Sequence, residues 1–171
     1  PEDLRRAHVG IHGTCEAVDR NVGRVLQALE RSGLLEETLV VYTSDHGGCA
    51  GDHGDWCIGS MYEGSIRVPL VVAGPGVQSG GVETAPVSHH DLFQTFCDAL
   101  GLDHPVHMRG TPLWDLFQGK VDPPKPAFTL SEYHAAGFPS SIFAIRSGHH
   151  KYVENVGERP SLFDLEQDPL E

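Results

Sequence analysis

The sequence is poor in basic residues and cysteine, and it contains no apolar run long enough to cross a membrane. Its 171 residues include 12 Lys and Arg against 24 Asp and Glu, which gives a formal net charge of −12 at pH 7. An acidic surface disfavours nonspecific binding to nucleic acids and anionic membranes, so we expect neither as a partner. A negatively charged substrate is compatible with the sequence, because a bound cation can reverse the local field.

The four cysteines are too sparse for a disulfide scaffold. None of Cys15, Cys49, Cys57 and Cys97 forms a C-x-x-C pair, the spacing that is typical of structural zinc sites. Cys15 and Cys97 fall on the apolar faces of expected helices. We therefore expect both to be buried free thiols.

The first two thirds of the sequence alternate between helical and strand patterns. Apolar residues at intervals of three and four predict a long amphipathic helix near Asp3–Ser32 and a second helix over His90–Leu100. Continuous β-type runs predict buried strands at Leu39–Thr43 and Val68–Ala73. This combination is typical of an α/β layer with a largely parallel sheet.

The end of the sequence has a different pattern, which follows a proline-rich connector at Lys120–Pro126. Short β-type runs with tight turns predict a small antiparallel sheet over Phe128–Tyr133, Ile142–Arg146, Lys151–Glu154 and Ser161–Asp164. We therefore divide the chain into an α/β portion, residues 1–122, and a small antiparallel β subdomain, residues 123–171.

The most informative motif follows the first expected strand, where Thr43 leads into Ser44-Asp45-His46-Gly47-Gly48. Ligands of open α/β sheets bind outside the carboxyl ends of strands. A carboxylate and an imidazole suit divalent cations, so Asp45 and His46 are candidate metal ligands. Alternatively, Asp45 caps the following turn and His46 is a partly buried polar residue. Two ligands do not complete a metal site, so further ligands must come from elsewhere.

A second cluster, Gly51-Asp52-His53-Gly54, surrounds a histidine with glycines. Glycine lets the backbone approach a ligand closely, and the His53 imidazole could act as a general acid or contact an anion. The alternative is a glycine-rich turn held by Asp side chains, which the residues alone favour.

Taken together, these segments resemble the C-terminal part of sulfatases of the alkaline phosphatase superfamily. The resemblance rests on several motifs in one order: VGRVLQALERSGLLEET, VVYTSDHGGCAGDHGDW, GSMYEGSIRVPLVVAGPG, VSHHDLFQTFCDALGL and RGTPLWDLFQGK. The ending SLFDLEQDPLE resembles the tail of choline-sulfatase-like and phosphonate-monoester-hydrolase-like members.

The resemblance implies the C-terminal portion of a sulfuric ester hydrolase that acts on a small-molecule sulfate ester. Residues 1–122 would then be the C-terminal portion of an α/β/α sandwich catalytic domain. Asp45 and His46 would complete a divalent metal site, with calcium as the first expectation and manganese as the alternative. His53 would be a catalytic contact, and His134 would approach the substrate from the small subdomain unless it is an ordinary surface histidine.

Three departures from the family pattern bear on catalysis. No cysteine or serine begins C/S-x-P-x-R, the motif from which the formylglycine nucleophile arises, and the amino-terminal Asp-Asp metal pair is absent. We therefore expect formylglycine upstream, in a longer enzyme, and expect the 171-residue chain alone to be inactive. Relatives also often carry a lysine twelve residues after the metal-pair histidine. Ile58 at that position indicates a divergent substrate contact or relaxed function.

Two alternatives stay open at this point. A phosphodiesterase or phosphonate monoester hydrolase of the same superfamily would have the same metal requirement, because sulfate and phosphate esters are similar in shape. A non-catalytic remnant that serves as a binding module would account for the missing nucleophile. A homo-oligomer is compatible with each interpretation.

Overall fold

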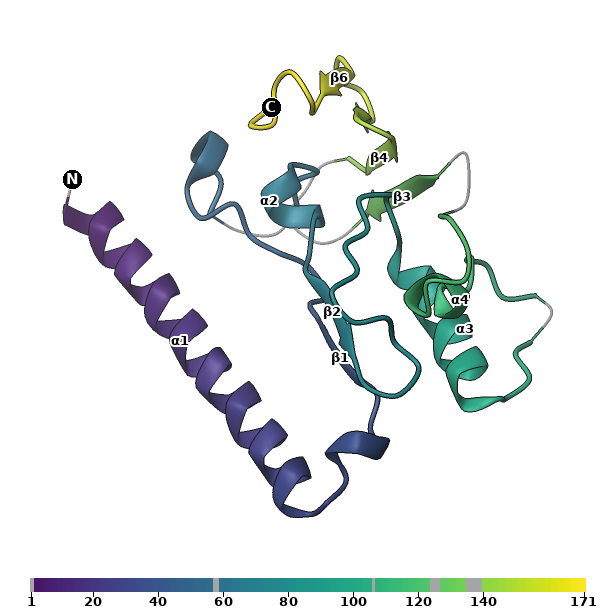
Figure 1. Cartoon of the computed structure of the whole chain (residues 1–171). Helices are drawn as coiled ribbons and strands as arrows, with labels where there is room; N and C mark the ends of the chain where they lie inside the picture. Colours follow the sequence, from purple (N-terminus) through teal and green to yellow (C-terminus); the bar gives the residue numbers. More distant parts are fainter. Residues whose placement is uncertain (1, 57–58, 106, 124–126, 135–139) are drawn as a thin grey trace. The chain divides into compact units, whose positions relative to one another are not determined.

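A computed structural model describes residues 2–56, 59–105, 107–123, 127–134 and 140–171 (Figure 1). The chain divides into two compact units, Pro1–Pro75 and Gly76–Glu171. Cys57, Ile58 and the last three residues of the proline-rich connector lie outside the described residues. The proposed division after residue 122 stays a prediction.

The first unit contains one long helix and one pair of short strands. Its elements are α1 (Glu2–Arg31), η1 (Leu35–Glu37), β1 (Val40–Thr43), η2 (Asp52–Gly54), α2 (Glu63–Ile66) and β2 (Leu70–Ala73). The strands β1 and β2 are antiparallel, with Val40 opposite Ala73 and Thr43 opposite Leu70. This pair therefore differs from the parallel arrangement expected. In the described part of the connection, residues 44–56 and 59–69, the helical segments are the short η2 and α2. A parallel pair needs a crossover connection, usually a helix.

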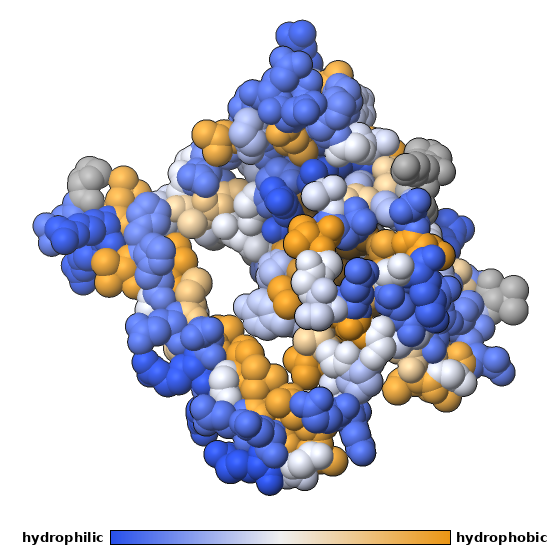
Figure 2. Space-filling view, viewed as in Figure 1, coloured by the Kyte–Doolittle hydropathy of each residue, from blue (hydrophilic) through white to orange (hydrophobic). Residues whose placement is uncertain are grey.

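The helix α1 forms as its apolar periodicity predicts, yet none of its 30 described residues is buried. Val9 and Val25 are exposed, and Figure 2 shows hydrophobic residues beside hydrophilic ones on the viewed face. The expected burial of Cys15 is wrong, because its side chain is exposed. Periodicity identifies the apolar side of a helix, but burial requires a second layer that covers it. No described helix is both long enough and apolar enough to span a bilayer.

The second unit contains two helices and a four-stranded sheet. Its elements are α3 (His89–Leu100), α4 (Trp114–Phe117), β3 (Phe128–Tyr133), β4 (Ile142–Ser147), β5 (His150–Asn155) and β6 (Ser161–Asp164). The sheet has the order β3-β4-β5-β6, and all neighbouring strands are antiparallel. The small antiparallel sheet predicted from the short β-type runs is therefore confirmed.

A capping box fixes the start of α3. The Ser88 hydroxyl accepts a hydrogen bond from the His90 amide at 3.3 Å, and Asp91 Oδ2 accepts one from the Ser88 amide at 2.7 Å. Two of the amide groups at the helix start thereby gain partners. Gly101, in the left-handed conformation with φ 64°, ends the helix. Cys97 is buried within this helix, as predicted.

The buried face of α3 holds the following loop through two side chains. Asp91 Oδ1 accepts a hydrogen bond from the Thr111 amide at 2.7 Å. The Thr95 hydroxyl donates to the Asp91 carbonyl at 2.6 Å and accepts from the Leu113 amide at 2.8 Å. Gly110 has φ 126°, and a Cβ there would lie 2.3 Å from the His90 carbonyl oxygen. Only glycine fits this approach of loop to helix.

Candidate functional site

Asp45 and His46 lie immediately after β1 and are held by short-range hydrogen bonds. Asp45 Oδ1 accepts a hydrogen bond from the His46 amide at 2.9 Å. The Ser44 hydroxyl donates to the His46 carbonyl oxygen at 2.8 Å. Asp45 therefore caps the turn, as in the alternative interpretation of the sequence. It also leaves Asp45 Oδ2 directed to the same region as the His46 ring.

The separation of these two side chains suits a shared cation. His46 Nε2 lies 3.7 Å from Asp45 Oδ2, and a divalent ion about 2.0–2.6 Å from each atom would span that gap. His46 Nδ1 lies 2.9 Å from the Gly47 carbonyl oxygen. A proton on Nδ1 satisfies that carbonyl, and this tautomer presents the Nε2 lone pair to a metal. The donor set therefore fits a divalent cation.

Electrostatics keep the Asp45 carboxyl group ionised. The hydrogen bond from the His46 amide, followed by the nearby His46 ring, lowers the pKa of Asp45 below its ordinary value. The side chains of Asp45 and His46 are 85% and 49% exposed in the described structure. Two exposed donors hold a cation weakly, so further ligands are needed to complete a tight site.

Gly47 fixes the backbone beside this pair. Its amide donates a hydrogen bond to the Ser65 carbonyl oxygen at 2.7 Å. A Cβ at this position would lie 2.2 Å from the Gly64 carbonyl oxygen, whereas a Cβ on Gly48 would meet nothing within 4 Å. The close contact with α2 therefore requires glycine at 47, the residue that follows His46.

His53 lies in the short helix η2 and contacts a different partner. Its backbone is left-handed, with φ 54° and ψ 16°, an uncommon conformation for a residue with a side chain. Its ring stacks on Tyr62 with centroids 3.8 Å apart and planes at 5°. Backbone hydrogen bonds close the turn, including one from the Gly51 amide to the Asp55 carbonyl oxygen at 2.9 Å. The side chain is exposed, and the catalytic role expected for it stays a prediction.

His134 follows β3 in the second unit and is fixed at both ring nitrogens. Nδ1 lies 2.9 Å from the Ser141 hydroxyl, and Nε2 lies 3.1 Å from Glu132 Oε2. The ring also meets Phe143 edge-on, with centroids 5.2 Å apart. These contacts account for His134 as a surface histidine of the sheet, and its role in substrate binding stays a prediction.

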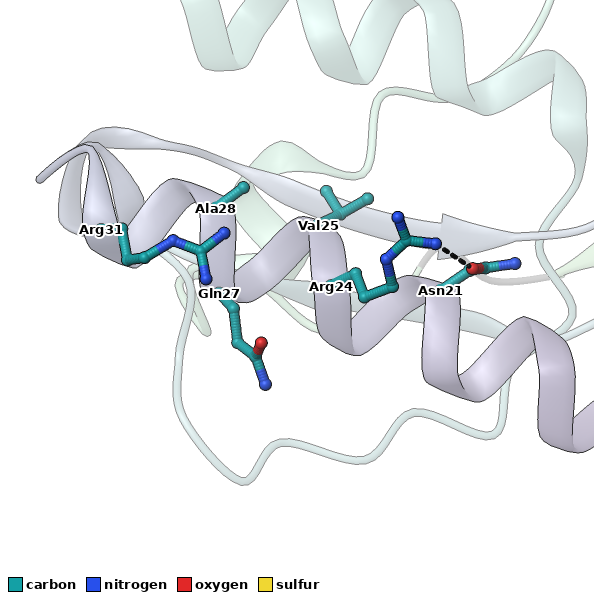
Figure 3. Close-up of a pocket in the computed structure, with 6 residues that line it drawn as sticks. All are labelled: Asn21, Arg24, Val25, Gln27, Ala28 and Arg31. Atoms are coloured by element: carbon teal, nitrogen blue, oxygen red, sulfur yellow. Dashed lines mark hydrogen bonds between the residues drawn. The ribbon is translucent and has the colours of Figure 1, made fainter.

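A pocket on α1 does not carry this chemistry. It is lined by Asn21, Arg24, Val25, Gln27, Ala28 and Arg31, all of one helix (Figure 3). The Arg24 guanidinium donates a hydrogen bond to Asn21 Oδ1 at 3.2 Å. The lining contains neither a carboxylate nor a nucleophile, so it is not a candidate catalytic site.

Sequence reasoning missed one cluster of metal-binding side chains. His149, His150 and Asp164 each place a ligand atom within 4.8 Å of the others. The adjacent histidines are visible in the sequence, but their proximity to Asp164 depends on the register of β5 with β6.

The comparisons with known proteins agree on one family. The sulfatase family model matches residues 11–102, more than half of the chain. Arylsulfatase K of Gallus gallus is 33% identical over 179 residues, covering 99% of this chain and 34% of that protein. Choline-sulfatase of Rhizobium meliloti (strain 1021) is 35% identical over 173 residues, covering 99% of this chain and 33% of that protein.

Solved structures also match most of the chain. An enzyme in complex with its substrate D-glucosamine-2-N,6-O-disulfate matches with a TM-score of 0.85 and 28% identity, over 92% of this chain and 33% of its own. Phosphonate monoester hydrolase of Agrobacterium radiobacter matches with a TM-score of 0.75 and 34% identity, over 90% of this chain and 34% of its own. The expected fold class, the C-terminal part of the α/β fold of these proteins with a small antiparallel sheet, is confirmed. The chain spans about a third of the length of these relatives, and it belongs to the sulfatase family.

Proposed function

We propose that this chain supplies two metal ligands, Asp45 and His46, to a sulfuric ester hydrolase whose nucleophile lies outside the 171 residues. The observation that carries the proposal is the 3.7 Å separation of Asp45 Oδ2 from His46 Nε2 at the end of β1. Membership of the sulfatase family supports it, and the lowered pKa of Asp45 keeps the carboxylate available to a cation.

The cation we propose is calcium, with manganese as the alternative. A bound divalent ion would polarise the ester oxygens and stabilise the negative charge that develops on the transferring group. The role of this chain is to hold the ion in one place. The Gly47 carbonyl orients the His46 ring, and the amide of His46 orients the Asp45 carboxylate.

His53 is the further contact that we propose in the first unit. Its stacking on Tyr62 restrains the ring. A restrained imidazole could donate a proton to a leaving group or hydrogen-bond an anionic ester oxygen. His134 is the weaker substrate-binding proposal, because Ser141 and Glu132 engage both of its nitrogens.

The substrate we propose is a small sulfate ester. The solved relative that binds D-glucosamine-2-N,6-O-disulfate, together with the sulfatase relatives, supports this class. The similarity to phosphonate monoester hydrolase of Agrobacterium radiobacter favours a second candidate, hydrolysis of phosphonate monoesters on the same metal site.

The test compares paired aryl sulfate and aryl phosphonate substrates with the full-length protein, before and after removal of divalent ions. We expect faster hydrolysis of the sulfate, loss of turnover in chelator, and recovery with calcium. Asp45→Asn should lower turnover at least a hundredfold, whereas Asp19→Asn on α1 should not change it. A faster phosphonate reaction would select the second candidate, and turnover that is unaffected by chelator would contradict both.

A further inference from the structure

We propose that His149, His150 and Asp164 form a second cation site, selective for zinc and similar borderline divalent ions. The ligand atoms of the three side chains all lie within 4.8 Å of one another. This site lies wholly in the Gly76–Glu171 unit and includes neither of the ligands proposed above, so it does not depend on the proposed hydrolase activity.

The backbone of the sheet brings the three residues together. β4 and β5 are joined by a two-residue turn, Gly148-His149, in which Gly148 has φ 58° as the first position of a type II′ turn requires. His150 begins β5, and its Cα partner on β6 is Asp164. Side chains at directly opposed strand positions are neighbours on the sheet, so the register places the Asp164 carboxylate beside the His150 imidazole, and the turn adds His149 next to it.

Additional hydrogen bonds fix these positions. The His149 carbonyl oxygen accepts a hydrogen bond from the Leu165 amide at 2.8 Å, which joins the turn to the end of β6. Asp164 Oδ1 accepts hydrogen bonds from the amides of Glu166 at 3.1 Å and Gln167 at 3.4 Å. The carboxylate is therefore held in place before any ion binds, which reduces the entropy lost on binding.

The donor set selects the kind of ion. The two imidazole rings lie with centroids 4.1 Å apart at a tilt of 44°, close enough for both to face one ion. Glu166 Oε2 lies 3.9 Å from His149 Nδ1, so this carboxylate can join the site or orient the ring. Two imidazoles with one or two carboxylates suit Zn²⁺, Co²⁺, Ni²⁺ and Cu²⁺, whereas Ca²⁺ prefers a shell made of oxygen atoms.

The alternative explanation is a set of surface ion pairs without a metal. Exposed pairs of this kind contribute little to stability, and the side chains of His149 and Glu166 are 49% and 77% exposed. A metal would instead link the β4–β5 turn to β6, so zinc should raise the thermal stability of the protein as well as bind to it.

The test is calorimetric titration of the full-length protein with Zn²⁺. The buffer contains millimolar Ca²⁺, which fills calcium sites before zinc is added. We expect one zinc equivalent that is lost, or bound at least tenfold more weakly, in H149Q/H150Q. The matched control H12Q/H107Q removes two exposed imidazoles elsewhere and should bind zinc as the wild type does. Unchanged zinc binding in H149Q/H150Q, or an equal loss in the control, would overturn the proposal.

Two further measurements separate loss of zinc binding from loss of folding, and the zinc site from the calcium site. If H149Q/H150Q folds poorly by circular dichroism, Asp164→Asn provides the second variant, since the amide oxygen can still accept the hydrogen bonds of Glu166 and Gln167. It should weaken zinc binding at least tenfold, and unchanged binding would overturn the site. Asp45→Asn should retain this zinc equivalent even where calcium binding is lost, which separates the two proposals.

Discussion

The ammonium group of Lys151 forms an ion pair with the side-chain carboxylate of Glu171 in the interior of the second unit. The Lys151 side chain has no exposed surface, and that of Glu171 is 2% exposed. The ammonium also lies 5.6 Å from the centre of the Phe163 ring. The pair attaches Glu171 to β5, so the turn that follows β6 is part of the sheet's packing.

Removing one member of this pair should destabilise the protein strongly. Lys151→Met removes the ammonium group that pairs with the buried Glu171 carboxylate, and loss of one partner of a buried pair typically costs about 3–5 kcal/mol. Urea unfolding should show that loss for Lys151→Met and for Glu171→Gln. The double variant Lys151→Met/Glu171→Leu should regain most of it. Single variants within about 0.5 kcal/mol of wild type would show that the pair contributes little.

Thr95 should be sensitive to loss of its hydroxyl group. Thr95→Val keeps the shape of the side chain but leaves the buried Leu113 amide without its acceptor, which typically costs about 1–3 kcal/mol. The control is Thr14→Val on α1, where the exposed hydroxyl bonds to the Gly10 carbonyl of its own helix. Its expected effect is within about 0.5 kcal/mol. Equal losses in the two variants would argue against a special role for the Thr95–Leu113 bond.

Gly47 and Gly48 should respond differently to alanine. A Cβ on Gly47 would lie 2.2 Å from the Gly64 carbonyl oxygen, so the backbone beside His46 must move. Calcium affinity of the full-length protein should fall at least tenfold in Gly47→Ala. Gly48→Ala, which introduces a Cβ into open space, should bind calcium as the wild type does. Normal calcium binding by Gly47→Ala would mean that this contact does not position the metal pair.

The pH dependence of the metal-free protein should report the environment of Asp45. The pKa of this carboxyl group is lowered, first by the His46 amide and then by the His46 ring. Its contribution to stability is therefore fully present above the unfolded-state pKa, at about pH 4, and is lost as the pH falls through the lower folded-state pKa.

Carboxyl titration by NMR checks this effect. The pKa of Asp45 should lie below its ordinary value in the wild type. In His46→Gln it should rise only partly, because the backbone amide remains while the ring is lost. A wild-type pKa at or above the ordinary value would contradict the hydrogen-bonded geometry of this turn.

Local sequence patterns were sufficient for the elements of the second unit. The expected strands Phe128–Tyr133 and Ser161–Asp164 match β3 and β6. The patterns gave wrong expectations where burial or strand direction depends on a second segment. Cys15 lies on an apolar stripe that no described element buries, and β1 pairs antiparallel with β2.

The same distinction applies to the candidate sites. Asp45 and His46 are adjacent in the sequence, so their pairing could be predicted without the fold. The proximity of His150 to Asp164 requires the strand register. Lysine side chains are usually exposed, so the sequence alone does not predict the buried pair of Lys151 and Glu171.

The most direct test of the metal proposal is a calcium titration of the full-length protein and of Asp45→Asn, with Asp19→Asn as the matched control. We expect Asp45→Asn to bind calcium at least tenfold more weakly, because an amide oxygen carries no charge to replace the carboxylate. Asp19→Asn, an exposed position on α1, should leave the affinity unchanged. Equal calcium affinity of Asp45→Asn and wild type would contradict the assignment of Asp45 as a metal ligand.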